Sequence, residues 1–135
     1  MALGRSLGVG QDQTLLVNLA EICVLEGDYA RAKDLYREAL RVARRHADGR
    51  AAQYACLGLA LCATADGDNE VAAKLHGLAD FQLKALGYVW APENLAFAEA
   101  DWLRLKSAMG SDRFEQAFAA GESWDIDEAL RLITP

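Results

Sequence analysis

A phrase that occurs twice, forty residues apart, constrains the fold of this chain more than any other feature. The first copy, residues 27–32, reads Gly-Asp-Tyr-Ala-Arg-Ala, and the second, residues 67–72, reads Gly-Asp-Asn-Glu-Val-Ala. Neighbouring apolar residues match at the same spacing: Leu19 with Leu59, Ala20 with Ala60, Leu35 with Leu75, and Ala39 with Ala79. A fixed period of this kind is typical of helical repeats, whose units are helix pairs that bury an apolar face against a neighbour.

Glycine and aspartate mark the turn inside each predicted pair. Gly27 ends the first helix, because a turn there needs a left-handed backbone that costs other residues roughly 1–2 kcal/mol. Asp28 follows as an N-cap of the next helix, and Gly67 and Asp68 repeat the arrangement. The sequence thus predicts repeat 1 over residues 12–46 and repeat 2 over residues 50–87, with helices over 12–26, 29–46, 50–65 and 69–86.

The second helix of each pair carries an apolar stripe at helical spacing. In the helix over 29–46 the stripe consists of Ala32, Leu35, Tyr36, Ala39, Leu40 and Ala43. In the helix over 69–86 the matching positions are Ala72, Leu75, His76 and Ala79. The alanines let neighbouring helices approach closely, while the larger side chains fill the space between them.

The repeat fades after residue 87, and the three tryptophans all lie in the remaining third. Pro92 is placed as a first-turn residue of a helix that ends at residue 110. A short helix follows, with Ser111 or Asp112 as its cap. The last helix begins at Asp125, with Glu128 completing a capping box. Since terminal units of repeat arrays are atypical, we expect this segment to close the stack.

The expected fold is therefore all-α, with about seven helices in an antiparallel hairpin stack and a C-terminal helical cap over residues 92–135. A length of 135 residues fits a single domain. No apolar run approaches the roughly 20 residues of a membrane span, and the N-terminus lacks signal-peptide features. We therefore expect a cytoplasmic protein.

The charge and the cysteines narrow the function classes. Residues 1–67 are electrically balanced, so residues 68–135 carry the whole net charge of −6. An acidic chain repels phosphate backbones, which disfavours direct nucleic-acid binding. The cysteines, Cys23, Cys56 and Cys62, form no CxxC pair and lie in helical patterns, so we expect buried free thiols. Neither a metal site nor a cofactor is predicted.

The string Leu-Ala…Gly-Asp-Tyr…Ala…Leu-Tyr…Ala-Leu over residues 19–40 resembles a tetratricopeptide repeat, with a second unit over roughly 53–86. Its period of forty exceeds the usual 34. The segments 72–80, 86–87, 114–121 and 127–130 together are similar to the C-terminal end of large actinobacterial regulators, of the LuxR type or linked to cyclases. Those carry a signalling ATPase ahead of tetratricopeptide-like helices, so the resemblance implies a regulatory arm.

This resemblance brings no nucleotide site, because the chain has no GxxxxGK[ST] motif. Some tetratricopeptide domains grip a carboxylate with Lys and Asn on the first helices of successive pairs. The matching positions here are Val17, Glu21, Tyr54 and Gly58, and Asn18 alone keeps a suitable donor. The carboxylate clamp is thus not expected, and a peptide in the groove would instead meet Asn18, Glu21 and Tyr54.

Two further partner-binding candidates stand out. Arg37, Arg41, Arg44 and Arg45 form a basic face on the helix over 29–46, which would suit an acidic partner or a neighbouring chain. The alternative is a solvated face in which nearby carboxylates balance the charge. Of the three tryptophans, which otherwise fit the core of the C-terminal cap, Trp90 is the one most expected to be exposed and to take part in an interface.

His76 occupies the inward position of Tyr36, which favours a packed, hydrogen-bonded histidine over a ligand or base. Asp80 follows one helical turn later and is a candidate to orient it. A small-molecule sensor with a pocket near His76 and Trp102 is the alternative function. An enzyme is disfavoured, because no nucleophile–base pair or phosphate loop is visible.

We expect a non-enzymatic module for protein–protein interaction or self-association in a bacterial signalling or transcription regulator. With two recognisable repeats, the N-terminal end should expose apolar surface, formed by Leu7, Leu15, Leu16 and Leu19. This surface predicts a homodimer or docking onto upstream repeats.

Overall fold

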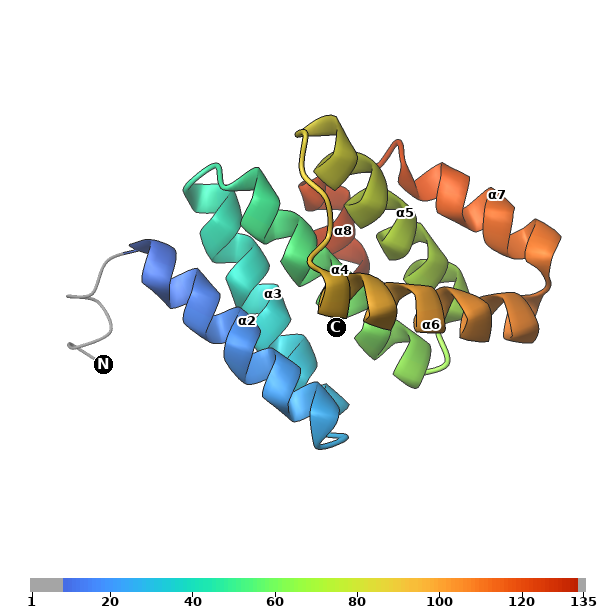
Figure 1. Ribbon diagram of the computed structural model, residues 1–135, viewed down its shortest axis with the longest axis horizontal. Helices are drawn as coiled ribbons and strands as arrows, with labels where there is room; N and C mark the ends of the chain where they lie inside the picture. The colour runs from blue at the N-terminus through green and yellow to red at the C-terminus, as the bar shows by residue number, and fades with distance from the viewer. Residues whose placement is uncertain (1–8, 134–135) are drawn as a thin grey trace.

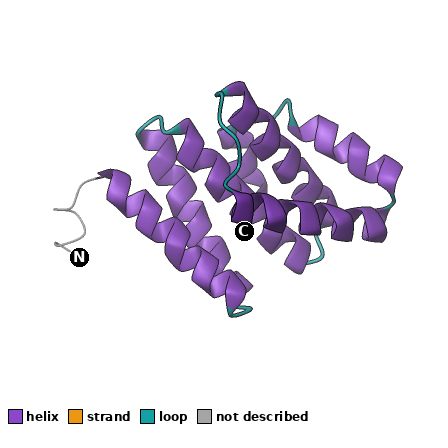
Figure 2. Cartoon of the chain, viewed as in Figure 1, coloured by secondary structure: helices purple, strands orange, loops and turns teal. Residues whose placement is uncertain are grey.

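The computed structural model describes residues 9–133, and these contain seven helices and no strand (Figures 1 and 2). The helices are α2 (Val9–Leu25), α3 (Tyr29–Arg45), α4 (Gly49–Ala65), α5 (Asn69–Ala85), α6 (Pro92–Met109), α7 (Ser111–Gly121) and α8 (Ile126–Ile133). The expected all-α hairpin stack is confirmed. No helix in this range combines the length and the apolar character that crossing a bilayer requires.

The first four helices form two antiparallel hairpins, α2–α3 and α4–α5, and α3 packs against α4 to join them (Figure 1). Each of these helices is 17 residues long. The forty-residue repeat therefore corresponds to two helices and two turns of constant length. Residue 7 lies outside the described residues, so nothing follows for that part of the predicted N-terminal surface.

The turns recur every twenty residues, so the structural period is half the period read from the sequence. Gly27, Ala47, Gly67 and Gly87 all have positive φ, at 80°, 54°, 81° and 86°. In each turn the next residue donates its N–H to a carbonyl five residues back: Asp28 to Cys23 (2.8 Å), Asp48 to Ala43 (2.9 Å), Asp68 to Ala63 (2.9 Å) and Tyr88 to Leu83 (3.1 Å). This bond closes a Schellman turn and satisfies a helix-terminal carbonyl.

The aspartates at these turns differ in how they cap. The carboxylates of Asp28 and Asp48 accept from backbone N–H groups at 3.3 and 3.1 Å. Asp68 occupies the predicted N-cap position, but its side chain makes no capping hydrogen bond. The position of the cap is therefore confirmed, and the expected side-chain bond is wrong. Before α8 the predicted capping box is confirmed, because the Glu128 N–H donates to Asp125 at 2.8 Å and the Asp125 N–H donates to Glu128 at 3.3 Å.

The predicted cap of the short helix is wrong. Gly110 takes the N-cap position of α7, and neither Ser111 nor Asp112 caps it, because both already lie inside the helix. The positive φ of Gly110, 87°, lets α7 start immediately after α6 ends. The chain therefore reverses without a separate capping residue.

Helix α4 is the centre of the molecule. It contacts α2, α3 and α5 as well as α6 and α8. Its buried residues surround the helix axis: Ala52, Gln53, Ala55, Cys56, Leu57, Gly58, Leu59, Ala60, Cys62 and Ala63. A helix that is apolar nearly all round needs neighbours on every side, which α2, α3 and α5 alone do not supply.

The C-terminal helices supply the missing neighbours. Helix α6 crosses the front of the stack in Figure 1 and contacts α4 and α5, whereas α8 lies behind and contacts α3 and α4. Helix α7 packs along α5, as the next layer of the stack would. The tail thus covers two faces of the stack in addition to its end.

The contact between α5 and α7 is close enough to exclude side chains. A Cβ on Gly77 would lie 1.9 Å from the backbone oxygen of Phe118, and a Cβ on Gly121 would lie 1.9 Å from that of Lys74. Both glycines are needed for this approach, because backbone cannot move aside as a flexible side chain can. The close packing fixes α7 against α5.

The turn between α3 and α4 holds an alanine in a strained backbone conformation. Ala47 has a left-handed φ of 54°, at the position where the equivalent turns have glycine. The Cβ costs roughly 1–2 kcal/mol in that conformation, so we expect Ala47→Gly to raise the free energy of unfolding by about 1 kcal/mol. Urea denaturation measures the change. Ala100→Gly, at an exposed position inside α6, is the matched control and should lower stability by about 1 kcal/mol. A destabilised A47G protein would contradict the strain.

Candidate functional site

A groove runs between α2, α4 and α6 on the front of the stack. Its larger pocket has a volume of about 360 Å³. The lining residues are Gln13, Thr14, Val17, Asn18, Glu21, Asp48, Arg50, Ala51, Tyr54, Ala91, Glu93 and Asn94. Asn18, Glu21 and Tyr54, which the sequence predicts to face a partner, therefore line one pocket. Whether they bind a partner stays a prediction.

A second, more apolar pocket of about 140 Å³ adjoins the first. It shares Glu21, Tyr54, Glu93 and Asn94 with the larger pocket. The rest of its lining is Val24, Leu25, Tyr36, Leu57, Gly58, Leu61 and Phe97. Because the two share four residues, they form one continuous depression, which we call the α2–α4–α6 groove.

Direct hydrogen bonds hold the start of α6 against the hairpins. The Tyr54 hydroxyl on α4 accepts from the Ala91 N–H at 3.0 Å. The Asn94 amide donates to the Glu21 carboxylate on α2 at 3.3 Å. These contacts set the distance between the groove walls, so the pocket shape depends on them.

Trp90 is not exposed, which corrects the sequence-based prediction. Its side chain is 8% exposed, and its Nε1 donates to the Asp80 carboxylate at 3.1 Å. The Tyr54 ring meets it edge-on at a centroid distance of 5.0 Å. Pro92 and Tyr88 nearby suggested a surface loop, but the indole has an acceptor on α5 that the sequence does not reveal. Trp90 anchors α6 from inside.

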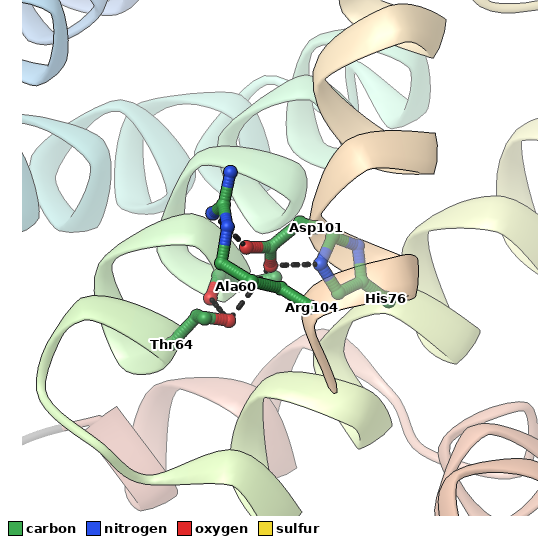
Figure 3. A network of polar contacts seen from close by, with 5 residues as sticks. All are labelled: Ala60, Thr64, His76, Asp101 and Arg104. Carbon is green, nitrogen blue, oxygen red and sulfur yellow. Dashed lines mark hydrogen bonds and ion pairs between the residues drawn. The ribbon is translucent and has the colours of Figure 1, made fainter. Parts of the chain in front are cut away.

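A buried carboxylate fixes the middle of α6 (Figure 3). Asp101 is fully buried, and its Oδ2 accepts from the Thr64 hydroxyl and from His76 Nε2, each at 2.7 Å. Its Oδ1 accepts from the Arg104 guanidinium at 2.8 Å. The donors come from α4, α5 and α6, so this single side chain ties three helices together.

The inward, hydrogen-bonded His76 agrees with the sequence-based interpretation, but its partner differs. Asp80, the expected partner, instead accepts from Trp90 and from Lys84. His76 is 1% exposed and packs edge-on against the Trp102 ring at 6.1 Å. Neither residue lines the pockets described above. An effector site near His76 and Trp102 stays a prediction.

The basic face of α3 is largely balanced within the chain. Arg37 pairs with Asp34 at 3.0 Å and Arg41 with Glu38 at 3.7 Å, in both cases along the helix. Arg44 reaches Asp127 of α8 at 2.8 Å. We expected these arginines to pair with acidic residues of a neighbouring chain or partner. For Arg44, the C-terminal helix of the same chain provides that acidic residue. Arg45 is exposed.

The thiols lie among apolar side chains. Cys23, Cys56 and Cys62 are buried and unbridged. Burial raises the pKa of the Cys56 thiol to about 12 and is also the main reason that the pKa of Cys62 rises to about 12. Both stay protonated at neutral pH, so they pack as small apolar groups. Within residues 9–133 no three His, Cys, Asp or Glu side chains converge as a metal-ligand set.

Several groove residues lack a clear sequence signal. Gln13, Arg50, Glu93 and Asn94 lie outside the repeated phrase, and only the placement of α6 brings the last two to the groove. Asp48 had a signal, because it falls midway between Asp28 and Asp68 and so marks the twenty-residue period. The predicted helices leave a turn between residues 46 and 50, but its equivalence to the Gly-Asp turns was missed because alanine replaces the glycine.

Comparison with known proteins adds no assignment: a scan of protein-family models, a search of curated proteins and a search of solved structures each found no match.

We expect Asp101→Ala to lower the free energy of unfolding by about 3 kcal/mol, because it leaves the buried His76 without its acceptor and removes the bonds from Thr64 and Arg104 that join α4 to α6 and brace α6. Chemical denaturation provides the measurement. Glu99→Ala, at an exposed position on the same helix, should change stability by less than about 0.5 kcal/mol. Equal stability of the two variants would show that the Asp101 cluster does not hold α6.

Proposed function

We propose that the protein is a non-enzymatic interaction module that binds a segment of a partner protein in the α2–α4–α6 groove. The main support for this proposal is the groove itself, in which a polar pocket of about 360 Å³ joins a more apolar one of about 140 Å³. Convergent polar groups beside an apolar surface are what a recognition site offers. The position of Asn18, Glu21 and Tyr54 in this groove supports the proposal.

The wider setting belongs to the same proposal. The resemblance of residues 19–40 to tetratricopeptide repeats, and of the tail to actinobacterial regulators, supports a regulatory arm of a bacterial signalling or transcription protein in the cytoplasm. The buried, protonated thiols of Cys56 and Cys62 and a buried His76 hydrogen-bonded to Asp101 support binding rather than catalysis.

Selection from a displayed library of random peptides tests the groove. We expect enriched peptides to lose at least about tenfold in affinity when Asn18→Arg places a long side chain in the pocket. Fluorescence polarisation with the selected peptides gives the affinities. Glu99→Arg introduces the same side chain at an exposed site on α6 outside the groove and should leave binding unchanged. Peptides that bind both variants equally would place recognition elsewhere.

Self-association is a second candidate, favoured by the outer face of α2. Leu15, Leu19 and Ile22 are 53%, 41% and 51% exposed. They recur at i, i+4 and i+7, so they form one stripe on the helix. Within residues 9–133 no other helix covers this stripe, and an uncovered apolar face is what one unit of a helical stack presents to the next. Leu16, also predicted to be exposed there, is half-buried instead.

The stripe predicts an association that charge disrupts. We expect the wild-type protein to sediment as a dimer at about 100 μM and Ile22→Glu to sediment as a monomer, because burying a carboxylate at an apolar interface is unfavourable by several kcal/mol. Sedimentation velocity gives the masses. Leu103→Glu, at a residue 68% exposed on α6, should leave the dimer intact. A wild-type monomer at this concentration would rule out self-association through α2.

A further inference from the structure

The polar half of the α2–α4–α6 groove is rich in carboxylates. Glu21, Asp48 and Glu93 line it together with one cation, Arg50. Glu21 and Asp48 accept from neutral amides of Asn94 and Gln13. Among the described residues none of the three carboxylates forms an ion pair with a basic side chain, in contrast to most other acidic side chains of the helices. The pocket therefore carries negative charge that the fold itself does not neutralise.

The one cation in the lining is held against aromatic rings. The Arg50 guanidinium carbon lies 5.4 Å from the centroid of Tyr54 and 5.4 Å from that of Tyr88. Two cation–π contacts favour this position of the guanidinium. The carboxylates are thus left to a positive group from outside.

A buried acceptor in the same pocket also lacks a donor. Gln13 is 4% exposed, and its Nε2 donates to the Asp48 carboxylate. Its Oε1 is buried and has no hydrogen-bond partner. A buried carbonyl oxygen without a donor is unfavourable, so a ligand that brought an N–H group to it would satisfy its hydrogen bonding. This observation is independent of the charge count, and it also points to a ligand that donates hydrogen bonds.

The adjoining half of the groove is apolar and favours a ligand with a large apolar group. Leu57, Leu61 and Phe97 line it with other apolar side chains, and Phe97 is 42% exposed. Glu21 and Glu93 lie at the boundary, since they line both pockets. A ligand that spans the groove would therefore place a cation and a bulky apolar group side by side.

We propose that the groove recognises a partner segment in which a lysine or arginine lies close in sequence to a large apolar residue. The cation meets Glu21 and Glu93 at the boundary of the two pockets, and the apolar side chain packs beside it between α4 and α6. A separate N–H group of the same segment donates to the Gln13 oxygen. This inference rests on the proposed groove function and names the chemistry of its partner. The groove would thus prefer a basic segment, whereas the carboxylate clamp of some tetratricopeptide domains binds an acidic chain end.

Fluorescein-labelled, end-capped peptides test the inference. The probes carry one lysine and one leucine separated by one, two or three serines. Matched peptides replace the lysine by norleucine, which keeps the apolar stem without the charge, or the leucine by serine. We expect the best lysine–leucine peptide to bind at least about tenfold more tightly than either matched peptide, because a charge-assisted contact or a buried leucine each contributes that much.

Substitution of the groove carboxylates tests where the lysine of the peptide binds. Glu21→Gln and Glu93→Gln keep side-chain shape and remove charge, so each should weaken the lysine–leucine peptide by about threefold to tenfold. The norleucine peptide should bind these variants and the wild type alike. Glu99→Gln, an exposed carboxylate of α6 outside the groove, is the control and should change nothing.

The outcomes separate this inference from the proposed function. If norleucine or acidic peptides bind as tightly as lysine peptides, and Asn18→Arg still blocks them, the groove function stands and the cation preference is wrong. If lysine peptides bind Glu21→Gln and Asn18→Arg as they bind the wild type, the attraction comes from the acidic chain in general, and the inference is wrong. If no peptide, selected or designed, is blocked by Asn18→Arg, both are wrong.

Discussion

The side chain of Asp101 is the interaction on which the groove depends. A carboxylate with no exposed surface is stable only when its oxygens receive donors, and here Thr64, His76 and Arg104 supply them. The donors come from three helices, so the cluster is satisfied only when α6 lies across α4 and α5. Because α6 is one wall of the α2–α4–α6 groove, a buried polar contact away from the pocket decides that the pocket exists. The indole bond between Trp90 and Asp80 fixes the near end of the same helix.

Close packing around α4 and α5 explains why the tail fits so tightly. The ring of Tyr36 occupies the space above Gly58, where a Cβ would lie 2.2 Å from ring carbons. Gly77 and Gly121 let α5 and α7 touch through their backbones. Such contacts tolerate little change, because interiors are packed at crystal-like density. The helices behind the groove are therefore closely packed, and such a preorganised wall would reduce the entropy lost on binding the proposed partner segment.

Charge is divided between two faces of the molecule. On α3, Arg37, Arg41 and Arg44 pair with carboxylates of the same chain. In the groove the carboxylates of Glu21, Asp48 and Glu93 remain without basic partners among the described residues. Unbalanced charge matters most where it lies in a depression, since field lines are focused there. The groove, rather than the arginine-rich helix, is thus the face whose electrostatics support the proposed basic partner.

The sequence by itself determined the helices, the turns of the first two hairpins and most of the apolar stripe of the helices over 29–46 and 69–86. These depend on local chemistry: the left-handed preference of Gly27 and Gly67, the capping carboxylate of Asp28 and the helical spacing of apolar residues. It also placed Asn18, Glu21 and Tyr54 on one surface, because the repeat fixes their relative positions. Only the tertiary structure decided that α6 crosses the stack, that Trp90 is buried and that Asp101 is the partner of His76. Those contacts join residues from different helices through single hydrogen bonds, and no periodicity or capping rule connects such residues along the chain.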